Sequence, residues 1–327
     1  MKAAFLDFDS IGPADIDTAA LLELLPGIEL YGSSTASEID ARLTGCAIVL
    51  VNKVDLDRDR LAAAAPALRL VVLAATGTDN VDLTAARDLG IAVANIRDYA
   101  TPSVVQHVFG LILALTLRLS EYRELLRSGA WERSPHFCLL DYPSRELAGK
   151  TLGILGYGQL GRAVGAVGQA FGMEVVAAHS LRDGGDAGAP GPGSAVSRLP
   201  LAELLGRSDV LSLHCPLTPA TRRVIGRDAL GRMRRDALLI NTARGDLVDP
   251  DALLAALEGG RLGGAGIDVL AGEPPARGNA LLNARLPNLI VTPHIAWAAR
   301  ESRQRALDEV VANVRDFLSG GRRNRVA

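Results

Sequence analysis

Three polar side chains in the second half of the chain are of types that could hold an anion and move a proton. Arg244 occurs in LLINTARGDLVD, Glu273 in AGIDVLAGEPP and His294 in VTPHIAW, each just after an apolar run. A guanidinium forks toward carboxylate oxygens. An imidazole gains and loses a proton near pH ~6.5, and a carboxylate can orient it. Singly, each has an ordinary role: a surface arginine, a helix cap, a turn histidine. Their joint occurrence at strand ends shifts the balance from these ordinary roles toward a functional site.

A glycine pattern precedes these residues in the chain. In TLGILGYGQLG, an apolar strand is followed by Gly156, Gly158 and Gly161, and Gln159 and Leu160 open a helical pattern. In a strand–turn–helix setting this spacing permits a tight turn, a close backbone approach to pyrophosphate and close helix–strand packing. The anion would lie at the helix N-terminus. The alternative is that the glycines serve only the turn.

The end of the next strand bears on which dinucleotide binds. An acidic residue there would bind the adenosine ribose hydroxyls of NAD. The stretch VVAAHSLRD instead places His179, Ser180 and Arg182 there, with no carboxylate before Asp183. The sequence therefore favours NADP, with Arg182 near its 2′-phosphate. The alternative is that Arg182 points into solvent and that either NADP or NAD is accepted.

The elements that must position these residues are strands alternating with helices. Near-continuous apolar strands with helices between them predict an α/β fold with parallel sheets covered on both faces. Helices are expected at 81–89, 101–127, 159–171 and 298–318. The helix that starts near Thr101-Pro102 is apolar on more than one side, which suits either a core helix or a subunit contact. Strands are expected at Lys2–Leu6, Ala47–Val51, Leu70–Ala74, Ile91–Ala94, Thr151–Leu155, Glu174–Ala178, Val210–Leu213, Ala237–Asn241, Ala265–Ile267 and Leu289–Val291.

Length and composition limit the classes of function. The 327 residues suit two domains, 48% of them are hydrophobic, and the net charge of −2 argues against nucleic acid as a partner. The N-terminus lacks the features of a signal or transit peptide, and no apolar stretch is long enough for a membrane span. Three cysteines with no metal-ligand spacing indicate a cytoplasmic protein without a structural metal.

These motifs, in this order, resemble the D-isomer-specific 2-hydroxyacid dehydrogenases. The resemblance rests on the glycine loop, then NTARG at 241–245, GEP at 272–274 and PH at 293–294, and it covers nearly the whole chain. The stretches ATGTDNVD, NIRDYATPSVVQH and TPHIAWAARE are most similar to the branch of glycerate dehydrogenase (hydroxypyruvate reductase).

The resemblance implies a role for each catalytic residue. Arg244 would hold the substrate carboxylate and polarise its keto oxygen. His294 would give that oxygen a proton as hydride arrives at carbon, and Glu273 would orient the imidazole. Other substrate contacts would come from Thr76 and Gly77 in the AATGTDN loop, from Asn52 and Lys53, and from Trp297. For Trp297, anchoring the last helix is an equally open role. His107 and His136 are interpreted as structural.

The resemblance also implies further cofactor contacts and an interleaved domain plan. Cys215, Pro216 and Thr218 would line the adenosine side, Thr242 and Ala243 the nicotinamide ribose, and Asp268 the carboxamide. A flavodoxin-like substrate domain would comprise residues 1–100 and 296–327, and a Rossmann-like dinucleotide domain residues 101–295. A cleft between them would close by a hinge, and the helix from Pro102 would form a homodimer contact.

The expected activity is the interconversion of a small 2-keto acid, hydroxypyruvate or glyoxylate, with its D-2-hydroxy acid. An alternative on the same scaffold is a dinucleotide-sensing, corepressor-like binding protein. Oxidation of formate or phosphite is less compatible, because formate oxidation needs no Glu-oriented histidine to shuttle a hydroxyl proton.

Overall fold

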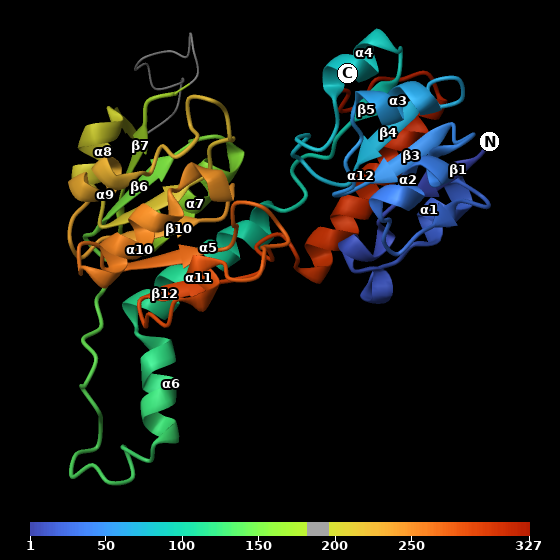
Figure 1. The fold of residues 1–327 in the computed structure, drawn as a ribbon. Helices are drawn as coiled ribbons and strands as arrows, with labels where there is room; N and C mark the ends of the chain where they lie inside the picture. The colour runs from blue at the N-terminus through green and yellow to red at the C-terminus, as the bar shows by residue number, and fades with distance from the viewer. Residues whose placement is uncertain (182–195) are drawn as a thin grey trace. The chain divides into compact units, whose positions relative to one another are not determined.

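The computed structural model describes residues 1–181 and 196–327. The chain forms two compact units, the first of Met1–Ala100 with Trp297–Ala327 and the second of Thr101–Ala296. Relative to the expected boundaries, Ala296 joins the second unit. Figure 1 shows each unit as a central sheet flanked by helices.

The first unit holds a five-stranded parallel sheet in the order β2-β1-β3-β4-β5. This is the flavodoxin-like order, in which the second strand lies at the edge beside the first. Strands β3 and β4 are wholly buried and rich in valine, leucine and isoleucine, as sheets covered on both faces require. The elements are β1 (Ala3–Phe5), β2 (Glu29–Leu30), β3 (Ile48–Val51), β4 (Leu70–Leu73), β5 (Ala92–Ala94), α1 (Ala19–Leu24), α2 (Ala36–Leu43), α3 (Arg58–Ala64), α4 (Leu83–Asp88), α12 (Arg300–Leu318) and the 3₁₀ turns η1 (Phe8–Ile11) and η2 (Pro13–Asp15).

The second unit holds a seven-stranded parallel sheet in the order β12-β11-β10-β9-β6-β7-β8. Read outward from β6, this is the Rossmann order with one added strand. The elements are β6 (Thr151–Leu155), β7 (Glu174–Ala178), β8 (Ser197–Leu199), β9 (Val210–Leu213), β10 (Leu238–Asn241), β11 (Gly264–Ile267), β12 (Leu289–Val291), α5 (Thr101–Thr116), α6 (Leu119–Arg127), α7 (Gln159–Ala170), α8 (Leu201–Arg207), α9 (Arg227–Arg232), α10 (Pro250–Glu258), α11 (Ala280–Asn283) and the 3₁₀ turn η3 (Gly245–Leu247). The prediction of two doubly wound parallel-sheet domains is confirmed.

The single helix expected over 101–127 is wrong. The structure has α5 and α6, which meet at a bend of 56°, with Arg118 in the left-handed conformation at the break. An ion pair between Arg118 and Glu121 stabilises the start of α6. Helix α5 buries much of its surface inside the second unit, whereas α6 and the chain after it extend away from the rest of that unit (Figure 1). The short strands β2 and β8 were not expected.

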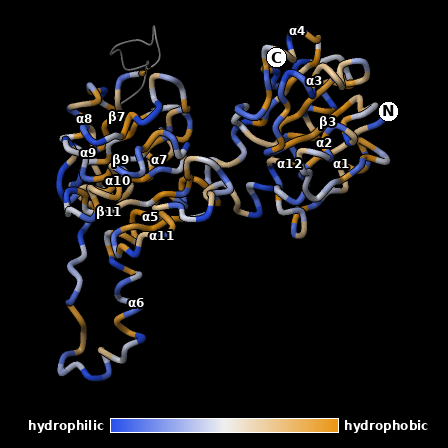
Figure 2. The backbone as a smooth tube through the Cα atoms, in the orientation of Figure 1, coloured by the Kyte–Doolittle hydropathy of each residue, from blue (hydrophilic) through white to orange (hydrophobic). Residues whose placement is uncertain are grey.

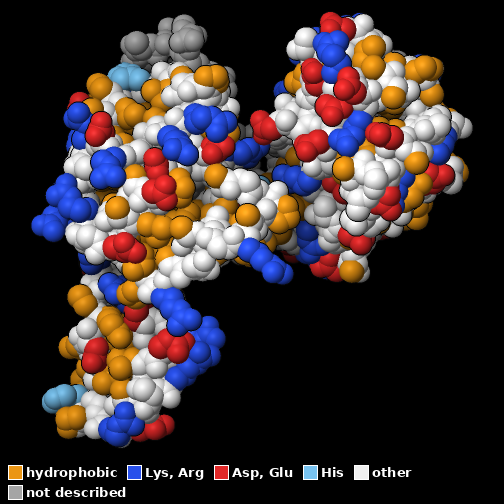
Figure 3. Space-filling view, viewed as in Figure 1, with side chains coloured by type: hydrophobic (Ala, Val, Ile, Leu, Met, Phe, Trp, Pro, Cys, Tyr) orange, Lys and Arg blue, Asp and Glu red, His pale blue; other side chains and the backbone are white. Residues whose placement is uncertain are grey.

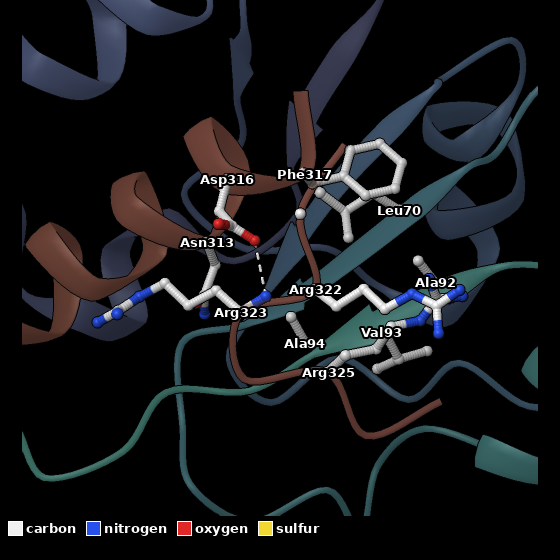
Figure 4. A pocket seen from close by; sticks show the side chains of 11 residues that line it. Leu70, Ala92, Val93, Ala94, Asn313, Asp316, Phe317, Arg322, Arg323 and Arg325 are labelled. Atoms are coloured by element: carbon white, nitrogen blue, oxygen red, sulfur yellow. Dashed lines mark hydrogen bonds between the residues drawn. The ribbon is translucent and has the colours of Figure 1, made fainter. Parts of the chain in front are cut away.

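Hydrophobic segments gather inside each unit (Figure 2). In the first unit, the C-terminal tail covers the open edge of the sheet, where the backbone of Val326 donates to Val93 and Arg325 bridges to Ala94. A small hollow remains between this tail, β5 and the end of α12, with Phe317, Arg322 and other residues around it (Figure 4).

Two searches of the described residues concern membranes and metals. No single helix is long and apolar enough to cross a bilayer, although α5 and α6 together meet the criteria of length and composition. Within the same residues, no group of three His, Cys, Asp or Glu side chains is placed to hold a metal ion.

Candidate active site

His294 and Glu273 form a close pair in the second unit. His294 follows β12, and its Nδ1 lies 2.5 Å from Oε2 of Glu273. The other carboxylate oxygen of Glu273 accepts a hydrogen bond from the backbone of Leu270 at 2.7 Å, which fixes the carboxylate. The side chains are 27% and 31% exposed, so the pair lies at the surface of this unit. The expectation that Glu273 engages one imidazole nitrogen agrees with this geometry.

Asp268 holds the loop that carries His294. Its buried carboxylate, at the end of β11, accepts hydrogen bonds from the backbones of Ile295 and Ala296, both at 2.9 Å, and from Oγ1 of Thr292 at 2.5 Å. The backbone of His294 donates to the Asp268 carbonyl at 2.8 Å. His294 has a φ of +56°, a conformation costly for most residues unless neighbours impose it. The carboxylate of Asp268 thus helps to hold His294 in this conformation.

His107 lies behind the same loop. Its Nε2 is 3.0 Å from Oγ1 of Thr292 and 3.4 Å from Oδ1 of Asp268. The sequence identified His107 only as a structural residue on a long helix. Its place beside the loop depends on the packing of α5 against β11, which no local pattern reveals.

Arg244 follows β10 in a tightly packed turn. Its carbonyl accepts from the side chain of Asn241 at 2.9 Å, and its guanidinium donates to the Ala243 carbonyl at 2.8 Å. The next residue, Gly245, packs directly on another backbone, because a Cβ there would lie 2.0 Å from the carbonyl carbon of Leu270. The Arg244 turn therefore contacts the segment that leads to Glu273.

The glycine loop has the expected local geometry. Gly156 has a φ of +99°, and a Cβ on it would lie 2.4 Å from the backbone nitrogen of Cys215. A Cβ on Gly161 would lie 2.3 Å from the Gly156 carbonyl. At Gly158, the N-cap of α7, a Cβ would meet no atom within 4 Å. Two of the glycines therefore serve protein packing, and Gly158 borders open space.

That open space belongs to a cavity of about 320 Å³ at the ends of β6, β7 and β9. Of the residues predicted to bind the cofactor, several line it: Gly156, Gly158, His179, Ser180, Cys215, Pro216 and Thr218. Others do not: Gln159, Leu160, Gly161, Thr242, Ala243 and Asp268. Arg182 lies outside the described residues. Gln159 donates to Oγ1 of Thr101 at 3.3 Å, and the Thr242 hydroxyl is buried with no partner among the described residues.

The sequence missed several residues that line this cavity, among them Tyr157, Arg198, His214 and Thr221. His214 lies 2.8 Å from the Ser212 hydroxyl, and burial lowers the pKa of His214 to about 4. Burial also raises the pKa of the Cys215 thiol to about 11. His214 could have been found as the residue that ends β9. Arg198 gave no such signal, because its strand was not expected.

The first unit has its own cluster at the ends of β1 and β3. Asp7 is buried, and its carboxylate accepts from the backbones of Asn52, Lys53 and Val54, at 2.8, 2.6 and 3.2 Å. Burial raises the pKa of Asp7. The buried side chain of Asn52 donates to Ser10 at 3.0 Å, so it supports the loop.

The other residues predicted for the substrate lie in the same unit. The Thr76 hydroxyl donates to the Ile96 carbonyl at 3.0 Å, and Gly77 follows it in the chain. The ring of Trp297 meets that of Tyr99 edge to face, with 6.3 Å between centroids. This contact at the start of the last helical segment is compatible with the anchoring role for Trp297. Substrate contacts by these residues stay predictions.

The second unit fits a dinucleotide. The cavity borders the glycine loop at the N-terminus of α7, where free N–H groups favour an anion, and the missing Cβ at Gly158 leaves room for one. None of the lining residues within 1–181 and 196–327 is acidic. A Rossmann sheet with this loop, and an Arg, a Glu and a His at its strand ends, defines a nicotinamide-dependent oxidoreductase.

Comparisons with known proteins agree with this class. The family described as "D-isomer specific 2-hydroxyacid dehydrogenase, NAD binding domain" matches residues 109–296. The chain is 47% identical to the glycerate dehydrogenase of Methylorubrum extorquens over 90% of both chains, and 36% identical to a hydroxypyruvate reductase of Blautia hydrogenotrophica over 98% of both. It also resembles the solved structure of an acyclic imino acid reductase in complex with NADPH and D-Arg, with a TM-score of 0.87, 26% identity and full coverage of both chains.

The chain therefore belongs to the D-isomer specific 2-hydroxyacid dehydrogenases. It is an oxidoreductase that uses a nicotinamide dinucleotide, and the predicted family is confirmed.

Proposed function

We propose that this enzyme reduces a small 2-keto acid, hydroxypyruvate or glyoxylate, to its D-2-hydroxy acid, and catalyses the reverse reaction. The observation that carries this proposal is the pair of His294 Nδ1 and Glu273 Oε2 at 2.5 Å, in the same unit as the Arg244 turn and the dinucleotide cavity. Relatives named glycerate dehydrogenase and hydroxypyruvate reductase support the choice of substrate.

The residues divide the reaction between them. Arg244 binds the substrate carboxylate and draws electron density toward the keto oxygen. Because Nδ1 of His294 faces Glu273, Nε2 is the atom that gives a proton to this oxygen in reduction and takes one back in oxidation. The bound nicotinamide supplies or accepts the hydride at the substrate carbon. The carboxylate of Glu273 keeps the imidazole oriented throughout.

The two units contribute different binding residues in this proposal. The second unit holds the dinucleotide, and the first unit contributes the loops of Asn52-Lys53 and Thr76-Gly77 to the substrate. The buried Asp7 supports the proposal, because it fixes the backbone at Asn52 and Lys53.

NADP is the proposed cofactor in preference to NAD. The support is the absence of any Asp or Glu among the described residues that line the cavity. A carboxylate there would repel a phosphate on the adenosine ribose.

The direct test is the loss of reduced-nicotinamide absorbance with hydroxypyruvate, glyoxylate and pyruvate, each with NADPH and NADH. His294→Ala should lower turnover by about 10²- to 10⁴-fold, the usual contribution of acid–base catalysis, while dinucleotide binding survives. The exposed His136, changed to alanine, is the matched control and should leave turnover intact. Unchanged turnover in His294→Ala would remove His294 from the mechanism.

The role of Arg244 is tested separately. Arg244→Ala should raise the Michaelis constant for the keto acid and also lower turnover, because the arginine acts on substrate and transition state alike. Arg232→Ala, on α9, is the control. A change confined to cofactor affinity would contradict the assignment of Arg244 to the substrate. Tight dinucleotide binding without turnover of any keto acid would favour the corepressor-like alternative.

The proposed assembly is a homodimer. The contact expected from the helix near Pro102 shifts in this proposal to α6 and the chain after it, because much of α5 is buried within its own unit. Figure 3 shows hydrophobic side chains on this extension, where Trp131, Phe137 and Leu140 are 53%, 91% and 84% exposed. A double change of Phe137 and Leu140 to serine should yield monomers in light scattering. An unaltered dimer would place the contact elsewhere.

A cytoplasmic location is also proposed. Its support is the state of Cys46, Cys138 and Cys215, all described and none in a disulfide, as a reducing compartment favours. Cell fractionation with an antibody tests it.

A further inference from the structure

We infer that Arg198 is the residue that selects for a 2′-phosphate on the adenosine ribose. This inference rests on the proposed use of NADP. Arg198 lies on β8, a short strand that the sequence did not indicate, and no motif of the chain includes it.

The position of Arg198 is the first argument. It pairs in register with Ala177 of β7, and its guanidinium donates to the Ala178 carbonyl at 3.0 Å. Ala178 ends β7, the strand after which an NAD-binding site carries its acidic residue. A permanent positive charge thus lies at the strand end where a negative charge would select for the ribose hydroxyls.

The setting of the guanidinium is the second argument. Arg198 lines the cavity of about 320 Å³ together with Ser180 and Tyr157. Tyr157 stands between two glycines of the dinucleotide loop in the sequence. The guanidinium carbon of Arg198 lies 5.4 Å from the centroid of the Tyr157 ring. This contact and the bond to Ala178 hold the side chain at the cavity wall.

The chemistry of the group is the third argument. A guanidinium presents five N–H donors in a planar fork, and the described structure uses one of them in a hydrogen bond, to the Ala178 carbonyl. A phosphate monoester carries between one and two negative charges at neutral pH and accepts such forks. Among the lining residues that the structure describes, no Asp or Glu competes for the arginine.

The test compares two ligands that differ only in the 2′-phosphate. Adenosine 2′,5′-bisphosphate and 5′-AMP are titrated calorimetrically into the full-length protein at one fixed ionic strength. We expect the wild type to bind the bisphosphate at least about tenfold more tightly. Arg198→Met, which keeps the aliphatic stem against Tyr157, should remove most of this difference and leave 5′-AMP binding within about threefold. Arg198→Lys should fall between, because it keeps the charge and loses the fork.

Three controls make the result specific. Arg207→Met removes an arginine of nearby α8 that pairs with Glu174, and it should leave both affinities unchanged. Inorganic phosphate should weaken binding of the bisphosphate more than that of 5′-AMP, because both ligands carry a 5′-phosphate and only the bisphosphate carries a 2′-phosphate. Arg182→Met tests the arginine favoured by the sequence. Thermal unfolding of each variant identifies any loss of folding, and Arg198→Lys then serves in place of a misfolded Arg198→Met.

Several outcomes would overturn the inference. The first is a wild type that binds the bisphosphate no more tightly than 5′-AMP. The second is an Arg198→Met variant whose affinity falls equally for both ligands. The third is a preference for the bisphosphate that survives in Arg198→Met and disappears in Arg182→Met. Because no readout needs turnover, the inference can fail while the keto-acid reduction stands. Conversely, an inactive protein that loses its bisphosphate preference with Arg198 would refute only the proposed reaction.

Discussion

Alanine at Gly158 and alanine at Gly161 should have opposite effects. A Cβ at Gly158 meets no protein atom within 4 Å, and its φ is −80°, which alanine adopts readily. A Cβ at Gly161 would lie 2.3 Å from the Gly156 carbonyl and 3.1 Å from a methyl carbon of Ile154. The first substitution fills space that a ligand should occupy, and the second fills space that the protein already occupies.

The expected magnitudes follow from these distances. Overpacking costs about 1–3 kcal/mol, and the contact at Gly161 is with backbone, which yields little. At about 2–4 °C per kcal/mol for a unit of this size, Gly161→Ala should lower the melting temperature by roughly 2–12 °C. Gly158→Ala should change stability by less than about 0.5 kcal/mol, the usual range for a substitution without new contacts. It should nevertheless weaken dinucleotide binding, since its methyl group lies where pyrophosphate would approach.

Thermal unfolding without ligand and calorimetric titration with NADPH measure the two effects. The reasoning would be refuted if Gly158→Ala bound NADPH as tightly as the wild type, because the cavity beside Gly158 would then not hold the pyrophosphate. It would also be refuted if both variants lost similar stability. Gly231→Ala, on α9 with no atom within 4 Å of its Cβ, controls for a glycine change in open space that does not line the cavity.

Two further predictions concern titratable side chains of the second unit, His214 and Asp268. The pKa of His214 is about 4 in the folded protein, against an ordinary value of 6.5 that applies to the unfolded chain. As the pH falls from about 6.5 to 4, the unfolded chain therefore takes up a proton that the folded protein does not, and the free energy of unfolding should fall. Urea unfolding of the ligand-free protein should show that His214 lowers the free energy of unfolding by about 2 kcal/mol at pH 5 relative to pH 7. His214→Gln should reduce this dependence of stability on pH. An equal dependence in the variant and the wild type would contradict the prediction. Asp268→Asn places an amide N–H toward the backbone donors of the His294 loop, so turnover should fall while NADPH affinity stays within about threefold; a loss mainly of NADPH affinity would favour the carboxamide role instead.

The sequence predicted the buried strands well, because short continuous apolar runs between turn signals are typical of strands covered on both faces. Strands β6, β7, β9 and β12 have the expected bounds. The two-residue β2 and the three-residue β8 are too short to show a pattern, and they form only because a neighbouring strand offers its open edge. The break at Arg118 was missed for a related reason, since neither proline nor glycine marks it and the helical spacing continues through it.

In the candidate site too, residues with a local sequence signal were predicted and residues placed by distant pairings were not. Arg244, Glu273 and His294 were found because each follows a recognisable strand or motif, and the structure brings Glu273 and His294 together. Asp7, His107 and Arg198 depend on pairings between segments far apart in the chain, which no local window contains. Asp268 shows the limit most clearly. Its position at a strand end suggested a ligand contact, yet its buried oxygens accept hydrogen bonds from the loop that presents His294. A strand-end location identifies a residue as part of a site, and only the partners of its atoms distinguish a residue that contacts the substrate from one that positions another.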